Sequence, residues 1–225
     1  MSKPEHEELK EKLQSEGGVS SAVAEKLLEY AESLIEINQV TNLTGAKTVE
    51  DFVLKQIMDT LLAIKVFNGL SSQLPPPSIV YDVGSGSGVP GIILAVVIPS
   101  IKVKLIEIRL RKSECLKQIS SKSALKNIEV QNTGIEKLKG FKMEHQLWFK
   151  GFMPGDRLIE FLDKGFPTGI KSKLILMKGP AWPEEKRKAL SLKKIRDYWK
   201  KRFECAIEEP YSLPDGAGQR ILVVV

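Results

Sequence analysis

The segment Ile79-Val-Tyr-Asp-Val-Gly-Ser-Gly-Ser-Gly-Val-Pro-Gly-Ile-Ile-Leu-Ala-Val-Val-Ile98 decides the fold of this chain. Its β-branched and aromatic start predicts a buried strand over 79–83, and its apolar end predicts a helix that stops before Pro99. Between them lie four glycines, at positions 84, 86, 88 and 91. A strand, a glycine turn and a helix in succession form the nucleotide-binding unit of a doubly wound sheet.

Two ligands suit this glycine turn. The string Gly86-Ser-Gly88-Val-Pro-Gly91 matches G-x-G-x-x-G, the fingerprint of dinucleotide-binding proteins. Asp82 followed by the triplet Gly84-x-Gly86-x-Gly88 resembles motif I of the S-adenosylmethionine (SAM) methyltransferases instead. A carboxylate beside the turn suits the sulfonium and ammonium groups of SAM, whereas it repels a pyrophosphate. A glycine turn without a ligand is the third alternative.

The flanking segments predict a layered α/β fold. Helices are expected at 20–40, 52–67, 111–124, 156–165 and 183–203, and further strands at 102–108, 128–131, 146–150, 173–178, 204–208 and 219–225. This alternation predicts a doubly wound, mainly parallel seven-stranded sheet covered on both faces, with an antiparallel final pair. The linker at 71–78, with three consecutive prolines, predicts a boundary between an N-terminal helical extension, 1–74, and a Rossmann-like domain, 78–225.

Composition limits the class of protein. The chain has 225 residues, of which 42% are hydrophobic. No apolar run approaches the ~18 residues of a membrane span, and residues 1–16 lack an apolar signal region. The two cysteines form no metal-ligand spacing. We therefore expect a cytoplasmic monomer without a membrane partner or a metal site.

The net charge of +6 is unevenly distributed. Residues 186–202 hold nine basic residues and one acidic residue, whereas residues 1–50 hold five lysines and ten glutamates. Such asymmetry predicts a polyanionic partner on one face, although a solvated helix face explains it equally well. The candidate phosphate-binding residues are Lys186, Arg187, Lys188, Lys193, Lys194 and Arg196.

Three further residues suit an adenosine. Glu107 ends the second predicted strand, where an acidic residue accepts both ribose hydroxyls of NAD or SAM. The alternative is a surface carboxylate paired with Arg109 or Arg111. Ile135 and Glu136 follow the third strand and are expected to border the adenine.

The histidines offer no general base. His6 and His145 are the only two, and neither lies in a catalytic pattern. A transferase whose substrate has a free lone pair needs no base, so the reaction class is restricted to such substrates.

Five segments, taken in order, give the chain a more specific resemblance. They are Asn42-Leu-Thr44, the Lys55-Gln-Ile-Met-Asp59-Thr60 segment, the glycine motif at 82–91, Leu176-Met-Lys-Gly179 and Arg220-Ile-Leu-Val-Val224. Together they resemble the bacterial small-subunit rRNA guanine-N7 methyltransferases, the glucose-inhibited division protein B family. The resemblance covers about residues 20–225.

The resemblance implies a class I methyltransferase fold, SAM as methyl donor, and N7 of guanine 527 in a loop of 16S rRNA as target. The small ribosomal subunit or its assembly precursor would then be the partner. With the motifs above, it gives the expected cofactor-binding residues as Asp82, Gly84, Ser85, Gly86, Gly88, Val89, Glu107, Ile135, Glu136 and Lys150, with Lys150 also expected to face the RNA. An NAD-dependent oxidoreductase and a non-catalytic RNA-binding module remain the alternatives.

Four positions depart from the family pattern. Gln56 replaces the usual His, Thr60 the usual Ser, and Phe149-Lys150 the usual Ser-Arg. Lysine keeps the positive charge of arginine but loses its two-pronged fork. Methyl transfer to guanine N7 needs no general base, because this nitrogen carries a lone pair and no proton. This agrees with the lack of a histidine in a catalytic pattern. The enzyme need only align N7 with the methyl group, on a loop base or an extruded base.

Overall fold

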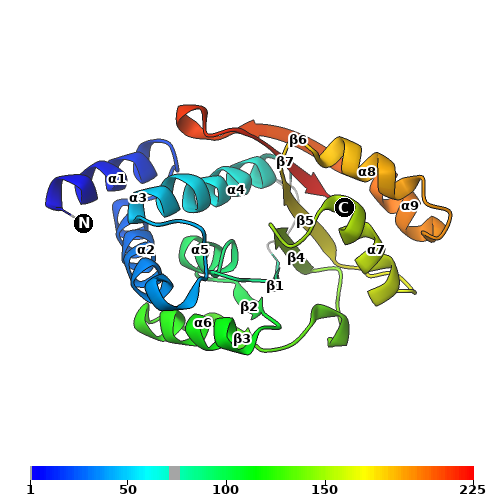
Figure 1. Cartoon of the computed structure of the whole chain (residues 1–225), viewed down its shortest axis with the longest axis horizontal. Helices are drawn as coiled ribbons and strands as arrows, with labels where there is room; N and C mark the ends of the chain where they lie inside the picture. Colours follow the sequence, from blue (N-terminus) through cyan, green and yellow to red (C-terminus); the bar gives the residue numbers. More distant parts are fainter. Residues whose placement is uncertain (1, 71–76) are drawn as a thin grey trace.

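The computed structural model describes residues 2–70 and 77–225 of the chain. Seven strands form one sheet in the order β3-β2-β1-β4-β5-β7-β6, with β7 antiparallel to both of its neighbours and all other pairs parallel (Figure 1). The strands are β1 Ile79–Val83, β2 Lys102–Ile106, β3 Ile128–Gln131, β4 His145–Lys150, β5 Lys173–Lys178, β6 Ile207–Ser212 and β7 Gln219–Val224. The predicted class I fold is confirmed.

Helices cover both faces of the sheet. They are α1 Lys3–Ser15, α2 Ser21–Thr41, α3 Val49–Phe52, α4 Met58–Leu70, α5 Gly91–Val97, α6 Leu110–Lys122, α7 Gly155–Gly165, α8 Trp182–Leu190 and α9 Asp197–Glu204. Successive residues of a strand face opposite sides, so β1 divides its side chains between two cores. Val80 packs with α1 to α6, whereas Tyr81 and Val83 pack with α7 to α9.

The N-terminal helices share a continuous core with the sheet. Ser20 and Thr48 cap α2 and α3 through their hydroxyl oxygens, which accept from Val23 N and Asp51 N. The helix predicted over 52–67 continues to Leu70 through a π-helical turn at Val53–Ile57. Residues 71–76 of the predicted linker lie outside the described residues, so the division into 1–74 and 78–225 stays a prediction.

The single helix predicted over 183–203 is wrong. The chain breaks at 191–196 because Arg196 turns toward α7, where its backbone N–H donates to an Asp163 carboxylate oxygen at 3.0 Å. Its guanidinium binds the other oxygen of that carboxylate at 2.7 Å. Since α9 then runs on to Glu204, the next strand begins at Ile207 rather than at 204.

Two smaller expectations also need correction. Strand β2 ends at Ile106, two residues early, because the Glu107 side chain bonds the backbone of the following loop. Helix α7 begins at Gly155, after Pro154, so the residue expected to cap it, Asp156, lies inside its first turn. Across residues 2–70 and 77–225, no helix is both long and apolar enough to cross a membrane.

Candidate active site

The glycine turn follows β1 at the carboxyl edge of the sheet. Gly84, Gly86 and Gly88 have φ of +73°, +54° and +95°, a conformation that side chains rarely tolerate. A Cβ atom on Gly86 would meet nothing closer than the Gly84 carbonyl oxygen, at 3.7 Å. At Gly91, by contrast, it would lie 2.7 Å from an Asp82 carboxylate oxygen. The backbone at Gly86 is thus open to a ligand, while Gly91 packs α5 against β1.

Asp82 lies beneath the turn with only 1% of its surface exposed. Its Oδ2 accepts from Gly91 N at 3.0 Å, and its Oδ1 has no hydrogen-bond partner among the described residues. Burial raises the pKa of this carboxyl to about 7. A buried carboxylate with one unpartnered oxygen is stabilised by a cation at the turn.

Glu107 joins the second strand to the same turn. Its two oxygens accept from Gly86 N at 3.0 Å and from Arg109 N at 2.8 Å. The Asn132 side-chain amide donates to the Glu107 and Ile108 carbonyl oxygens, which fixes the loop. Glu107 is 5% exposed, so the alternative of a surface ion pair is wrong.

Four other predicted cofactor residues lie in different surroundings. The Ser85 hydroxyl donates to the Asp82 carbonyl oxygen at 2.9 Å, within the turn itself. Val89 and Ile135 are buried in the two hydrophobic cores, on opposite faces of the sheet. Glu136 is half-buried in the short 3-10 helix Ile135–Lys137. Contacts of Val89, Ile135 and Glu136 with a cofactor stay predictions.

Lys150 ends β4 inside a buried polar network. Its ammonium lies 2.6 Å from Gln56 Oε1 and 3.2 Å from Asp59 Oδ2. Asp59, 2% exposed, accepts at Oδ1 from the Tyr211 hydroxyl at 2.7 Å, and Arg220 Nε lies 3.7 Å from Oδ2. Burial and this carboxylate both raise the pKa of Tyr211. The network therefore joins the π-helical turn and α4 to three strands of the sheet, β4, β6 and β7.

Sequence reasoning did not predict this network. The resemblance pointed to the segments at 55–60 and 220–224 but gave no sign that their charged residues meet at Lys150. The Lys150 charge favours the ionised form of Asp82, which places the network within electrostatic range of the glycine turn.

Two aromatic residues hold the turn from outside. The Phe152 ring occupies the space into which a Cβ atom on Gly84 would project. From α2, the Tyr30 hydroxyl donates to the Ser87 carbonyl oxygen at 2.8 Å. The N-terminal helices thus contact the turn directly, and no sequence motif had marked either residue.

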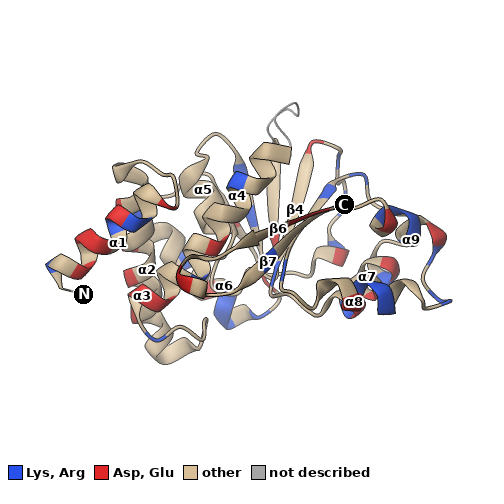
Figure 2. Ribbon diagram, turned by 90° about the horizontal axis from the view of Figure 1, so that it is seen from above, with Lys and Arg blue, Asp and Glu red and all other residues tan. Residues whose placement is uncertain are grey.

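The basic segment after β5 is largely paired with acids. Five of its predicted RNA-binding residues form ion pairs: Lys186 with Glu208, Arg187 with Glu184, Lys188 with Asp156, Lys194 with Glu160 and Arg196 with Asp163. Lys193 is exposed and has no acidic partner within the described residues. Figure 2 shows red and blue interleaved on α7 to α9, whereas α1 to α3 are mainly red. Because exposed ion pairs contribute little energy, this pairing does not prevent the cations from binding phosphates. An RNA role for this segment stays a prediction.

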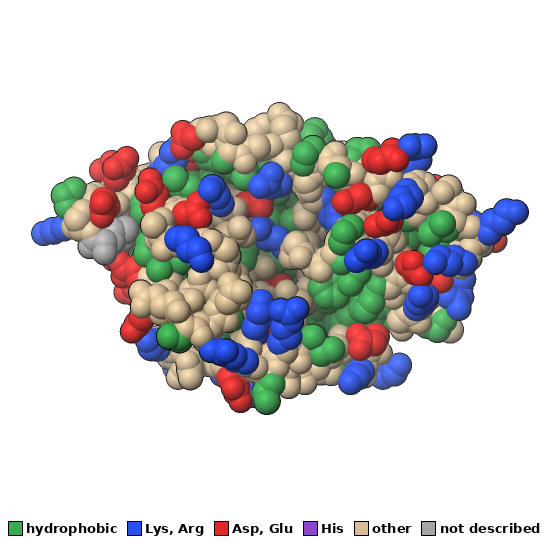
Figure 3. Space-filling model, in the orientation of Figure 1, with side chains coloured by type: hydrophobic (Ala, Val, Ile, Leu, Met, Phe, Trp, Pro, Cys, Tyr) green, Lys and Arg blue, Asp and Glu red, His purple; other side chains and the backbone are tan. Residues whose placement is uncertain are grey.

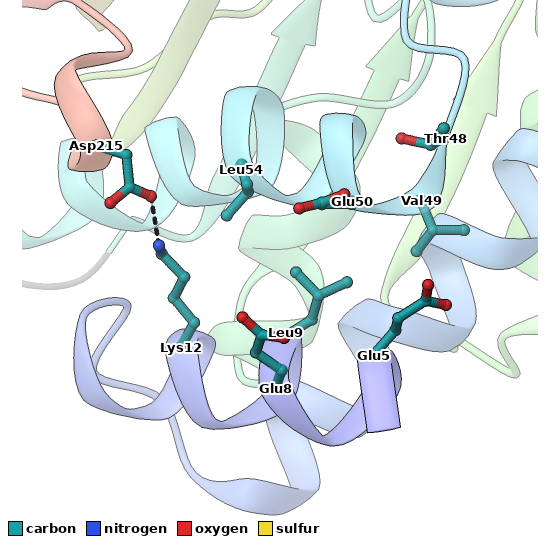
Figure 4. Close-up of a pocket in the computed structure, with 9 residues that line it drawn as sticks. All are labelled: Glu5, Glu8, Leu9, Lys12, Thr48, Val49, Glu50, Leu54 and Asp215. Carbon is teal, nitrogen blue, oxygen red and sulfur yellow. Dashed lines mark hydrogen bonds and ion pairs between the residues drawn. The ribbon is translucent and has the colours of Figure 1, made fainter. Parts of the chain in front are cut away.

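Figure 3 shows the face around the carboxyl edge, hollowed near its centre over the ends of β1 and β4, with Lys and Arg side chains around the hollow. A separate cavity of about 610 Å³ lies between α1 and α3 (Figure 4). Its lining includes Glu5, Glu8 and Glu50, and an ion pair between Lys12 and Asp215 closes one side. That cavity is acidic and does not suit a polyanion.

The sheet order and the glycine turn define a class I methyltransferase. Two solved structures share this fold. The methyltransferase domain of METTL16 has a TM-score of 0.54 and is 12% identical, over 87% of this chain and 78% of that one. A ribosomal protein L11 methylase from Lactobacillus delbrueckii subsp. bulgaricus has a TM-score of 0.50 and is 13% identical, over 81% of this chain and 80% of that one.

The family model for rRNA small subunit methyltransferase G, GidB, matches residues 23–209, and the chain belongs to this family. Its relatives include Ribosomal RNA small subunit methyltransferase G of Brachyspira hyodysenteriae, 36% identical over 155 residues, or 69% of this chain and 71% of that protein. The protein of the same name from Solibacter usitatus is 27% identical over 219 residues, 97% and 98% of the two chains. The predicted family is confirmed, and the chain is an rRNA methyltransferase.

Proposed function

We propose that this chain transfers the methyl group of SAM to N7 of a loop guanine in 16S rRNA, at the position that the family resemblance gives as guanine 527. The partner is the small ribosomal subunit or its assembly precursor, and the protein acts as a monomer in the cytoplasm. The single observation that carries the proposal is the open backbone at Gly86, with the buried carboxylates of Asp82 and Glu107 beside it. This set suits a ligand with an adenosine and a positive charge.

The residues of the turn fit SAM, which supplies an electrophilic methyl group on its sulfonium when it is bound. The unpartnered Oδ1 of Asp82 provides negative charge for a cationic ligand. Each Glu107 oxygen accepts one backbone N–H and keeps a free lone pair for a ribose hydroxyl. The assigned cofactor-binding residues are Asp82, Gly84, Ser85, Gly86, Gly88, Val89, Glu107, Ile135, Glu136 and Lys150.

Guanine N7 needs no proton removed, so the work of this chain is alignment and exclusion of water. Lys150 is assigned to the methionine end of the cofactor or to the target base, because Gln56 and Asp59 hold its ammonium in one place. The cationic residues Lys186, Arg187, Lys193, Lys194 and Arg196 are assigned to rRNA phosphates. Lys193 is the strongest candidate among them because it needs no ion pair broken.

The first test is calorimetric titration of the protein with SAM, S-adenosylhomocysteine and NAD. We expect the first two to bind and NAD to bind at least a hundredfold more weakly, since a pyrophosphate would meet two carboxylates at the turn. Tighter binding of NAD would support an oxidoreductase instead. Binding of none of the three would favour a non-catalytic RNA-binding module.

A further inference from the structure

Seven large apolar side chains of the described residues are exposed, and three of them lie where α2 ends and α6 begins. Val40, at the end of α2, is 72% exposed, and Ile108 and Leu110, at the start of α6, are 67% and 60% exposed. The Arg111 guanidinium donates to the Val40 carbonyl oxygen, so the two segments lie side by side. We call Val40, Ile108, Arg109 and Leu110 the apolar rim.

The backbone of the rim is held in place. Glu107 bonds the backbone N–H groups of Gly86 and Arg109, and Asn132 bonds the Glu107 and Ile108 carbonyls at 2.9 and 3.0 Å. Ile108 is therefore exposed on a loop whose backbone is fixed, and it directly follows Glu107, the predicted ribose-binding residue. Whatever covers Ile108 and Arg109 must therefore lie next to the predicted ribose site.

The charge of the rim favours an anionic occupant. Arg109 is exposed, and its guanidinium has no carboxylate partner in the described part of the chain, unlike the three cations of α8, Lys186, Arg187 and Lys188. The first turn of α6 adds Arg111 and Lys112 and contains no acidic residue. Cations at that end of a helix are unfavourable for the helix itself, so this arrangement gains most from a negatively charged partner.

We propose that the apolar rim docks the single-stranded rRNA that flanks the target guanine. Ile108 and Leu110 pack against the face of an unstacked base, and Arg109 binds the adjoining phosphate. Single-stranded RNA offers this alternation of apolar ring faces and anionic groups, and a target base that leaves its stack exposes its neighbours. The inference rests on the proposed function, because that function requires a loop guanine to reach the turn.

The test compares the parent protein with two variants, Ile108→Ser/Leu110→Ser and Arg109→Ala. Binding of a hairpin RNA that contains the target guanine is measured from low to high KCl, together with kcat/KM on small-subunit particles and calorimetric SAM affinity. We expect the double variant to bind RNA about tenfold more weakly with an unchanged salt slope, because it loses apolar contact only. We expect Arg109→Ala to reduce the salt slope by about one unit.

Matched controls come from the opposite, amino edge of the sheet. Met143 is 73% exposed before β4, and Lys126 is exposed before β3. Met143→Ser and Lys126→Ala should leave RNA affinity and kcat/KM at the parent values. All variants should keep the SAM affinity of the parent, which also shows that they are folded.

Three results would overturn the docking proposal. Equal RNA binding by the parent and both variants shows that RNA does not cover the rim. A loss of SAM affinity in step with RNA affinity assigns Ile108 and Leu110 to the cofactor site. A change in oligomeric state of the double variant assigns the rim to self-association. A parent protein that methylates no rRNA contradicts the proposed function separately, and the hairpin measurement still decides the rim.

Discussion

Replacement of Asp82 by Asn should stabilise the ligand-free protein and weaken SAM binding. Burial raises the pKa of this carboxyl from its ordinary 3.8 to about 7. At ~1.36 kcal/mol per pKa unit, keeping it ionised above pH 7 costs about 4 kcal/mol. Between pH 3.8 and about pH 7 the Asp82 carboxyl holds its proton in the folded protein but loses it in the unfolded chain. The free energy of unfolding therefore falls as pH rises through this window and stays low above it.

The amide of Asn removes this charge but introduces a new cost. Its oxygen keeps the hydrogen bond from Gly91 N, while its N–H₂ group falls where Oδ1 has no partner. An unsatisfied buried donor costs about 1–3 kcal/mol. Asp82→Asn should thus be about 1–3 kcal/mol more stable than the parent at pH 8, and should lose the fall in stability between pH 5 and pH 7.

Urea unfolding at pH 5, 6, 7 and 8 without ligand measures the stability, and calorimetry at pH 8 measures SAM affinity. Asp197→Asn is the matched control, because it makes the same change of net charge on an exposed residue at the start of α9. An Asp82→Asn protein that is no more stable than the parent at pH 8 would refute the burial argument. Unchanged SAM affinity would refute the role of the charge at the turn.

Three more outcomes follow from the same contacts. Glu107→Ala should weaken SAM and S-adenosylhomocysteine equally, by about 1.5–3 kcal/mol in calorimetry, and a loss confined to SAM would contradict a ribose role. Asp59→Asn should lower the free energy of unfolding, measured in urea, by about 3 kcal/mol, because it leaves the buried Lys150 ammonium without its carboxylate. Adding Lys150→Met to this variant should recover part of the lost stability, and no recovery would show that the two residues are not coupled. Lys193→Ala should reduce the salt slope of RNA binding by about one unit, which is more than Lys194→Ala should, because Lys194 is already paired with Glu160. If both variants kept the salt slope of the parent, the RNA surface would lie elsewhere.

The succession of strands and helices along the chain, and the place of the cofactor turn, could be predicted from local sequence. A β-branched run that ends at Asp82 and four glycines in eight residues leave few other structures for 79–91. Glu107 was predicted at the turn because the second parallel strand must end at the same edge of the sheet as β1. The structure adds that its carboxylate binds the Gly86 backbone.

The errors and omissions arise from contacts between distant segments. The break between α8 and α9 depends on Asp163, 33 positions before Arg196, and helical periodicity does not register such a partner. The buried group around Asp59 joins residue 56 to residue 220, so no local pattern reveals it. The charge of 186–202 was counted along the chain, whereas its compensating acids lie mainly on α7 and β6.

Methyl transfer to small-subunit particles that lack the modification tests the central claim most directly. The particles are incubated with the protein and SAM labelled in its methyl group, and the modified base is mapped by reverse transcription and mass spectrometry. We expect one 7-methylguanosine per 16S rRNA, in a loop, with no label when Glu107→Ala and Asp82→Asn are combined. Label at another atom or another base, or no label with the parent protein at saturating SAM, would contradict the account.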